Sequence, residues 1–579
     1  MKKSLLRAMT AMCVLMGAAQ MAQAQTITHT EARETRLPED EIIYFVLTDR
    51  FYNGDTGNDR GGLSGGREVT GFDPTSDSFY HGGDLKGLTQ KLDYIQGLGA
   101  TALWISPPFK NQPVVGSGKD IYAGYHGYYI NDFLTIDPHF GTGADFRAFV
   151  EAAHARGLKV YLDIVINHTG DIIKNRECAD RYCDYRSTGD YPAPGAGESA
   201  YTPFVPRGLE KAKNPDWLND LGNYHNRGES TYEGESSIYG DFAGLDGVKT
   251  ENPEVIKGFI DIYSYWIDEY KIDGYRIDTA RHVNPEFWQI FIPAIQARAR
   301  ANGIENFHIF GEIMDTDVAI QAAHTLVDGM PNVLDFPLAY AILDVVTGQA
   351  GTQKLTQIFR SDVVYAGGTQ TARRHATFTG NHDMGRIAFL IRDKLPEISD
   401  AELLQRVELA HALMLFSRGV PVLYYGDEQG FVGDGHDRGA REDMMPSKVA
   451  SFNDNRLIGN AKTTADDNFD SGTVLYQTFA RMAQVRLSSD DLRYGESVVR
   501  LHTAQGAGLL AVQRKRKGAK GETLVVYNTG LEPVTANVPV EATSRHWRSL
   551  YGQCALEVRQ TGSLSVSVPP LGVIVCESK

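Results

Sequence analysis

From about residue 40 to residue 490 the chain alternates short apolar runs with segments whose apolar residues recur at helical spacing. A short continuous apolar run is typical of a buried strand, and a period of three to four residues is typical of a helix that covers a sheet. Eight runs of the strand type occur, at residues 42–47, 101–105, 158–166, 272–277, 307–310, 333–338, 376–379 and 420–425. Helical patterns between them include residues 85–98, 144–155, 255–270 and 285–301.

The alternation of strands and helices predicts a parallel sheet covered by helices. Eight strands over this length fit a (β/α)8 barrel, the TIM-barrel fold. A doubly wound open sheet is the alternative, but no G-x-G-x-x-G turn follows the first strand. We therefore expect an α/β protein built on a (β/α)8 barrel.

Two parts of the chain depart from this alternation. About eighty residues rich in Gly, Asn, Tyr and Asp follow the third strand, and this length predicts a small inserted domain. After about Asp491, short period-two strands predict a separate antiparallel β-sandwich. The predicted parts are a signal peptide (1–24), a barrel in two sections (25–168 and 249–491), the inserted domain (169–248) and the C-terminal β domain (492–579).

The first 24 residues have the composition of an export signal. A basic start, a mostly apolar stretch and an A-x-A cleavage site at Ala22-Gln23-Ala24 follow one another. A membrane anchor is the alternative, but the apolar stretch is short for a span and polar residues interrupt it. We predict cleavage near Ala24 and a secreted or periplasmic protein that is not attached to a membrane afterwards.

Net charge and cysteine content narrow the picture further. The formal charge of −16 opposes binding to nucleic acid and anionic lipid, so we expect a neutral substrate. We also expect a monomer. Four cysteines remain after cleavage, and an even number in an exported protein predicts the disulfides Cys178–Cys183 and Cys554–Cys576. Free thiols or a zinc site are the alternatives, but no pair of His residues stands at ligand spacing nearby.

Polar side chains follow four of the predicted strands, and strand ends are where catalytic groups of such barrels lie. The four segments are Asp163-Ile-Val-Ile-Asn167-His168, Gly274-Tyr-Arg276-Ile-Asp278, Gly311-Glu312 and Asn381-His382-Asp383. One such residue alone is weak evidence, because an Asp after a strand is most often a helix cap or a turn former. Together, however, these groups can complete one reaction on one face of the barrel.

That reaction is glycoside hydrolysis, which needs a carboxylate on one side of the anomeric carbon and a carboxylic acid on the other. Arg276 and Asp278 are two residues apart, so on a strand both side chains point the same way. The guanidinium is therefore expected to keep Asp278 ionised. Glu312 has no basic neighbour in sequence, which suits a proton donor. Asp383 and His382 are candidates for binding sugar hydroxyls.

The four segments resemble, in order and spacing, the signature regions of the α-amylase superfamily of glycoside hydrolases. They correspond to its D-x-x-x-N-H, G-x-R-x-D, G-E and N-H-D segments, and the resemblance covers about residues 40–579. It implies that Asp278 is the nucleophile, Glu312 the general acid/base and Asp383 a stabiliser of the transition state. It also implies that Arg276 positions Asp278, and that His168 and His382 bind the glucose in the −1 subsite.

The resemblance also implies further substrate contacts. Tyr128 resembles the aromatic residue that stacks on the −1 glucose, although a core tyrosine fits the sequence equally well. Arg281 stands where many α-amylases have a Lys that contacts the acceptor-side sugar.

A calcium site is implied as well, held by the Asn167 side chain and the His282 backbone carbonyl, since oxygen ligands suit this ion. The family often has a further calcium ligand, the Asp of an L-x-D-L pattern. In the matching segment here, Leu245-Asp246-Gly247-Val248, Gly247 stands at the position of that Asp. Either Asp246 shifts to serve as the ligand, or the site is weak or lost.

Taken together, these implications favour a secreted retaining glycoside hydrolase that cleaves α-1,4-glucosidic bonds in starch, maltodextrins or related α-glucans. A cyclodextrin-forming or glucan-transferring transglycosylase and a cyclodextrin- or pullulan-degrading relative are the alternatives on the same scaffold. Cyclodextrin-forming enzymes usually carry additional β domains, which favours hydrolysis here. A non-catalytic sugar-binding relative would have lost carboxylates, and all three are present.

Overall fold

The computed structural model describes residues 32–578, apart from 117, 119–120, 179–180, 191–199, 556–557 and 559–561. The predicted signal peptide lies outside the described residues. Glu31–Lys579 form one compact unit. Within the described part of the chain, no helix has both the length and the apolar character needed to cross a membrane.

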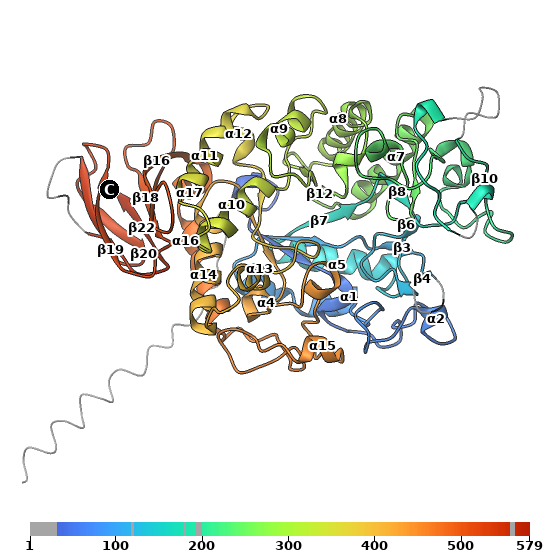
Figure 1. The fold of residues 1–579 in the computed structure, drawn as a ribbon, viewed down its shortest axis with the longest axis horizontal. Helices are drawn as coiled ribbons and strands as arrows, with labels where there is room; N and C mark the ends of the chain where they lie inside the picture. The colour runs from blue at the N-terminus through green and yellow to red at the C-terminus, as the bar shows by residue number, and fades with distance from the viewer. Residues whose placement is uncertain are drawn as a thin grey trace, which may run out of the picture. The chain divides into compact units, whose positions relative to one another are not determined.

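A parallel sheet forms the centre of the fold (Figure 1). Seven strands follow the order β13-β12-β7-β2-β1-β15-β14. Parallel bridges from Gly311 to Val333 and from Leu334 to Ala376 place an eighth, very short strand between β13 and β14, which closes the ring. The predicted barrel is therefore confirmed. Its strands are β1 (Ile43–Val46), β2 (Ala102–Ile105), β7 (Lys159–Ile164), β12 (Gly274–Ile277), β13 (His308–Gly311), β14 (Ala376–Thr377) and β15 (Val420–Tyr424).

The sixth predicted strand, residues 333–338, is much shorter in the structure. Only Val333 and Leu334 pair with neighbouring strands, and helix α10 (Phe336–Val346) begins directly after Asp335. The Asp335 carboxylate accepts the amide of Leu338, and Pro337 lies in the first turn, so an N-cap and a proline start the helix inside the apolar run.

Helices lie between successive strands, largely where the apolar spacing predicts them. They include α5 (Gly143–Ala155), α7 (Pro253–Tyr270) and α8 (Pro285–Ala301). The predicted helix at residues 85–98 is divided at Lys91 into α3 (Leu85–Gln90) and α4 (Leu92–Gly97). The apolar faces of these helices join the strands in one continuous core.

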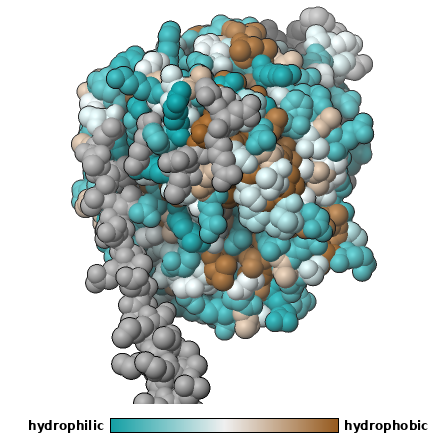
Figure 2. All heavy atoms as spheres, turned by 90° about the vertical axis from the view of Figure 1, so that its left-hand side faces the viewer, coloured by the Kyte–Doolittle hydropathy of each residue, from teal (hydrophilic) through white to brown (hydrophobic). Residues whose placement is uncertain are grey.

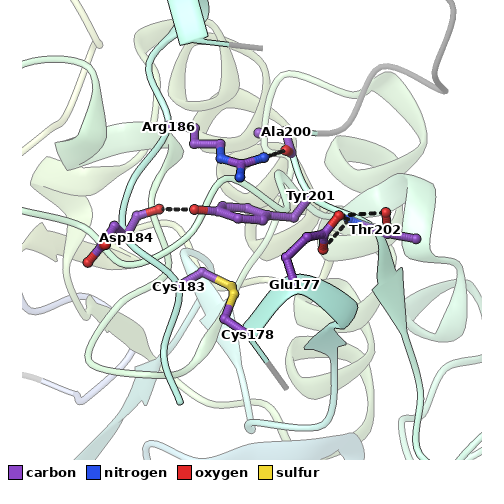
Figure 3. The surroundings of a disulfide bond; sticks show 8 residues. All are labelled: Glu177, Cys178, Cys183, Asp184, Arg186, Ala200, Tyr201 and Thr202. Atoms are coloured by element: carbon purple, nitrogen blue, oxygen red, sulfur yellow. Dashed lines mark hydrogen bonds between the residues drawn. A yellow bond between two sulfur atoms is a disulfide. The ribbon is translucent and has the colours of Figure 1, made fainter. Parts of the chain in front are cut away.

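The inserted segment, residues 169–248, begins and ends beside the barrel because β8 (His168–Thr169) pairs antiparallel with β11 (Asp246–Gly247). The predicted disulfide Cys178–Cys183 is present. Figure 3 shows the neighbouring contacts, in which the Arg186 guanidinium lies 3.9 Å from the centroid of the Tyr201 ring. The Tyr201 hydroxyl donates a hydrogen bond to the carbonyl of Asp184, so the disulfide and these contacts hold a segment with little regular structure.

The C-terminal part is the predicted antiparallel β domain. One sheet has the order β16-β17-β18-β22-β20, and β19 pairs with β21 beside it. Apolar residues of both sheets form a second core. The predicted disulfide Cys554–Cys576 is present, and it links the segment after β20 to β22. In the view of Figure 2, hydrophilic residues dominate the surface and apolar residues gather in separate groups. The strands are β16 (Glu496–His502), β17 (Leu509–Lys515), β18 (Thr523–Asn528), β19 (Val534–Pro539), β20 (Trp547–Tyr551), β21 (Ser563–Val568) and β22 (Gly572–Ser578).

Candidate active site

The four polar segments meet at the carboxyl ends of the barrel strands, as the sequence predicts. A cavity of about 470 Å³ opens there, and Asp278, Glu312 and Asp383 all line it. Asp278 directly follows β12 and Glu312 directly follows β13, whereas Asp383 lies on the loop after β14. The Asp278 and Glu312 side chains are buried except for a small exposed fraction, so a substrate in the cavity meets them in a largely dry environment.

A fully buried arginine links the acidic groups. Arg276 Nη1 lies 2.8 Å from Asp278 Oδ1, and Arg276 Nη2 lies 2.8 Å from Glu312 Oε1. Arg276 on β12 is paired in register with Asp163 on β7, and Nη1 also donates to Asp163 Oδ1 at 2.8 Å. One guanidinium therefore fixes three carboxyl groups. The sequence predicts its contact with Asp278 but not its contact with Glu312.

Asp163 is a member of this site to which the sequence assigned no role. Its carboxylate also accepts hydrogen bonds from Trp104 Nε1 and from the Tyr128 hydroxyl, each at 3.0 Å. Burial raises the pKa of Asp163 to about 6, although Arg276 opposes the shift. A carboxylate inside a fully buried strand was the signal that could have identified it.

Burial also raises the pKa of Asp278 to about 7 and the pKa of Glu312 to about 7. Arg276 lowers both values, but desolvation exceeds its effect, and Asp383 adds a repulsive negative charge to each. Arg276 thus favours the ionised form of Asp278, as the sequence predicts, but burial opposes this effect and exceeds it. Two acids of similar pKa beside one guanidinium hold a single proton over part of the neutral range, so one is ionised while the other is protonated.

We predict that kcat/KM on a neutral maltooligosaccharide passes through a maximum near pH 7. Activity falls at lower pH because Asp278 gains a proton, and it falls at higher pH because Glu312 loses one. An exposed pair of carboxyl groups would instead place the maximum at about pH 4. A rate profile recorded from about pH 4 to pH 10 checks this, and a maximum near the lower end contradicts the proposed environment.

Asp383 is held by a second arginine that the sequence did not single out. Arg441 Nη2 donates to Asp383 Oδ1 at 3.0 Å, and Arg441 Nε donates to the backbone carbonyl of His382 at 3.0 Å. Arg441 lies in a long glycine-rich segment, residues 427–470, that follows the last barrel strand, and no strand-end pattern marks it there. The Asp383 side chain is 40% exposed, which leaves it accessible from the cavity.

The two predicted histidines, His168 and His382, are buried and neutral. Burial lowers the pKa of His168 to about 3 and lowers that of His382 well below its usual range. His382 Nε2 lies 2.7 Å from the hydroxyl of Tyr128, whose side chain also lines the cavity. Neutral imidazoles both donate and accept hydrogen bonds, which is the capacity that sugar hydroxyls require.

Arg281 and His282 line the same cavity on the side of the inserted segment. Arg281 Nη1 donates to the backbone carbonyl of Met314 at 2.7 Å and forms an ion pair with Asp315. His282 Nδ1 lies 2.8 Å from the backbone carbonyl of Ser237 in the inserted segment. Arg281 therefore lies at the wall of the cavity, and His282 joins that wall to the inserted segment.

Two of the residues expected to bind calcium, Asn167 and Asp246, have different partners in the structure. Among the described residues, no three His, Cys, Asp or Glu side chains converge as they would around a metal ion. Asp246 is occupied by an ammonium group, because Lys213 Nζ lies 2.5 Å from its Oδ2. The Asn167 backbone carbonyl accepts the amide of Val248, which joins Asn167 to the end of the inserted segment.

A barrel whose strand ends carry two acids bridged by one arginine, with a third acid in the same cavity, has the fold and the site of a glycoside hydrolase. The model of the α-amylase catalytic domain matches residues 45–464, so this chain belongs to the α-amylase family, a family of retaining enzymes.

Individual relatives agree with this membership. An α-amylase of Streptomyces lividans is 41% identical over 540 residues, which are 89% of this chain and 58% of that protein. The chain thus spans less than two thirds of the length of this relative. The crystal structure of an α-amylase from Geobacillus thermoleovorans complexed with acarbose has 26% sequence identity and a TM-score of 0.69. The likeness covers 94% of this chain and 99% of that one.

A third likeness bears on the alternative activity. The crystal structure of a cyclomaltodextrin glucanotransferase with a three-domain ABC distribution has 28% identity and a TM-score of 0.71. It covers 93% of this chain and 99% of that one. A glucanotransferase can therefore have only three domains, so the number of β domains alone does not separate hydrolysis from glucan transfer.

Proposed function

We propose that this protein is a retaining hydrolase of α-1,4-glucosidic bonds in starch, maltodextrins or related α-glucans. The observation that carries the proposal is the shared guanidinium, since Arg276 contacts both Asp278 and Glu312 at the wall of the cavity. Asp278 acts as the nucleophile, Glu312 as the general acid/base, and Asp383 binds the sugar as charge develops in the transition state.

In the first step Asp278 attacks the anomeric carbon while Glu312 donates its proton to the departing glycosidic oxygen. The C–O bond to the leaving sugar breaks, and an ester to Asp278 forms. Glu312 is then a carboxylate, and because the esterified Asp278 carries no negative charge, the pKa of Glu312 falls and Glu312 stays ionised as the base for the next step. In the second step Glu312 takes a proton from water, the water oxygen bonds to the anomeric carbon, and Asp278 leaves as a carboxylate.

Residues around these acids orient the sugar in the proposed mechanism. His168 and His382 donate and accept hydrogen bonds as neutral imidazoles, and Tyr128 lies against the −1 glucose. Arg281 contacts the acceptor-side sugar. Substrate that fills the cavity expels water, which strengthens each of these interactions.

The acceptor in the second step distinguishes the two activities of this scaffold. Water gives hydrolysis, whereas a sugar hydroxyl gives transglycosylation. A product profile on starch, maltooligosaccharides, pullulan and cyclodextrins tests the proposal. We expect linear maltooligosaccharides that shorten with time. Cyclic products or products longer than the substrate would overturn hydrolysis as the main activity and favour the glucanotransferase alternative.

The cellular setting is part of the proposal. The two disulfides fit an extracellular or periplasmic protein, and the predicted cleavage near Ala24 would supply the export. The negative charge supports a neutral glucan as partner and no nucleic acid. The monomeric state and the bounds of the inserted and C-terminal domains stay predictions. Members of the α-amylase family commonly bind calcium, and we include this ion in the proposal.

A further inference from the structure

The inserted segment ends at a position where a calcium ligand of the family is missing. Gly247 has no side chain, and its neighbour Asp246 is committed elsewhere. Lys213 and Asp246 form an ion pair in which both side chains are almost fully buried. The backbone amides of Ile172 and Ile173 donate to the same carboxylate. The Asp246 carboxylate therefore already has a cation and two amide donors, which leaves it poorly suited to bind a metal ion.

Another carboxylate occupies the space that a side chain at position 247 would fill. A Cβ atom built on Gly247 would lie 3.2 Å from Asp241 Oδ1 and 2.9 Å from the carbonyl oxygen of Gly240. The Gly247 amide donates to Asp241 Oδ1 at 2.9 Å. Asp241 thus brings an acidic group to the position at which the sequence pattern lacks one.

The acidic residues near Gly247 differ in whether a cation balances their charge. Asp171 pairs with Lys174, and Asp246 pairs with Lys213. In the described part of the chain, by contrast, no Lys, Arg or His side chain forms an ion pair with Asp241, and the Gly247 amide that donates to its carboxylate is neutral. A partly buried carboxylate without a cation costs free energy, and a bound cation would remove that cost.

Asp241 also lies close to the other two expected ligands. The Val248 amide, next to Gly247, donates to the backbone carbonyl of Asn167 at 2.9 Å. Phe242, next to Asp241, has its ring centroid 5.2 Å from that of His282. Hydrogen bonds and ring packing therefore place Asp241, Asn167 and His282 in one small region between the inserted segment and the barrel.

We propose that Asp241 supplies the acidic ligand of a calcium ion, in place of the side chain that Gly247 lacks. The Asn167 side-chain oxygen and the His282 backbone carbonyl complete the protein's share of the ligands, and Ca²⁺ favours such oxygen donors. Lys213 acts in parallel by neutralising Asp246, so the two neighbouring acids are balanced by different cations. The bound ion joins the inserted segment to the barrel.

Thermal unfolding of the full-length protein in excess Ca²⁺ and in excess chelator tests this assignment. Calcium is expected to raise the Tm of the wild type, because a ligand that binds only the native state stabilises it. Asp241→Asn is expected to lose that rise. It should also have a higher Tm than the wild type in chelator, because it removes an unbalanced charge. This reversal separates a lost ligand from simple damage to the fold.

Asp246→Asn is the matched control. This variant is expected to have a lower Tm in both solutions, because it leaves Lys213 buried without its partner, but to keep the full rise in Tm caused by calcium. In the double variant Asp241→Asn, Gly247→Asp the carboxylate returns to position 247, and part of the rise should return with it.

Calorimetric titration of the metal-free protein with Ca²⁺ alone gives a second reading. We expect one site in the wild type and in Asp246→Asn, and an affinity at least about 100-fold lower in Asp241→Asn, as loss of the only acidic ligand implies. The proposal is overturned if the wild type shows no effect of calcium, if Asp241→Asn keeps it, or if Asp246→Asn abolishes it. None of these readouts uses catalysis, so they stand apart from the test of the proposed activity.

Discussion

Asp278→Asn is expected to lower kcat on maltooligosaccharides by at least about 10³-fold, since an amide cannot form the covalent intermediate. The amide oxygen can still accept the hydrogen bond from Arg276, so the geometry of the site and the affinity for oligosaccharide should be kept. Initial rates together with calorimetric binding of a maltooligosaccharide measure the two quantities separately.

Asp344→Asn is a suitable control for that variant. Asp344 lies in α10 and pairs with Lys354 at the surface, away from the cavity, so the substitution should leave kcat within about twofold. Near-normal turnover of Asp278→Asn would remove the proposed nucleophile from the mechanism. A loss of binding equal to the loss of rate would assign Asp278 to substrate binding instead.

Glu312→Gln is expected to lower kcat on maltooligosaccharides by about 10²- to 10⁴-fold, because the leaving sugar then departs without a proton. An α-glucosyl fluoride has a leaving group that needs no proton, so its first step should be slowed much less. The second step still lacks a base, so the covalent intermediate should accumulate. Its formation should be seen as a burst of released fluoride.

The comparison with Asp278→Asn makes this test specific. That variant should lose activity on both substrates and show no burst, because no covalent intermediate forms. An equal loss on maltooligosaccharide and fluoride in Glu312→Gln would contradict its role as the acid. It would place the residue in binding or in the support of Arg276, which it contacts.

Much of the barrel could be predicted from the sequence, because its strands are buried on both faces and read as continuous apolar runs. The limits arose where local chemistry acts against the apolar pattern. Residues 333–338 are apolar enough for a strand, yet Asp335 and Pro337 start a helix after two barrel residues. The pattern at 85–98 similarly gave no sign of the break at Lys91.

The acids at the strand ends could be predicted because strand order brings their positions to one face. Contacts that depend on the register of neighbouring strands could not be predicted. The pairing of Arg276 with Asp163 and its reach to Glu312 depend on how neighbouring strands align. Arg441 reaches Asp383 from a long irregular segment whose path no period describes.

The shift in acidity was equally hidden from the sequence. Arg276 suggested an ionised Asp278. Burial, which arises only when the chain folds, decides that the pKa of Asp278 is raised and not lowered.

The configuration of the first product tests the central claim most directly. If Asp278 attacks the anomeric carbon and water then displaces it, two inversions leave the original α-configuration. If Asp278 instead served as a base for water, a single inversion would give the β-anomer. Proton NMR of a maltooligosaccharide digest, recorded before mutarotation, distinguishes the two. We predict that the α-anomer appears first, and early β-anomer would contradict Asp278 as the nucleophile.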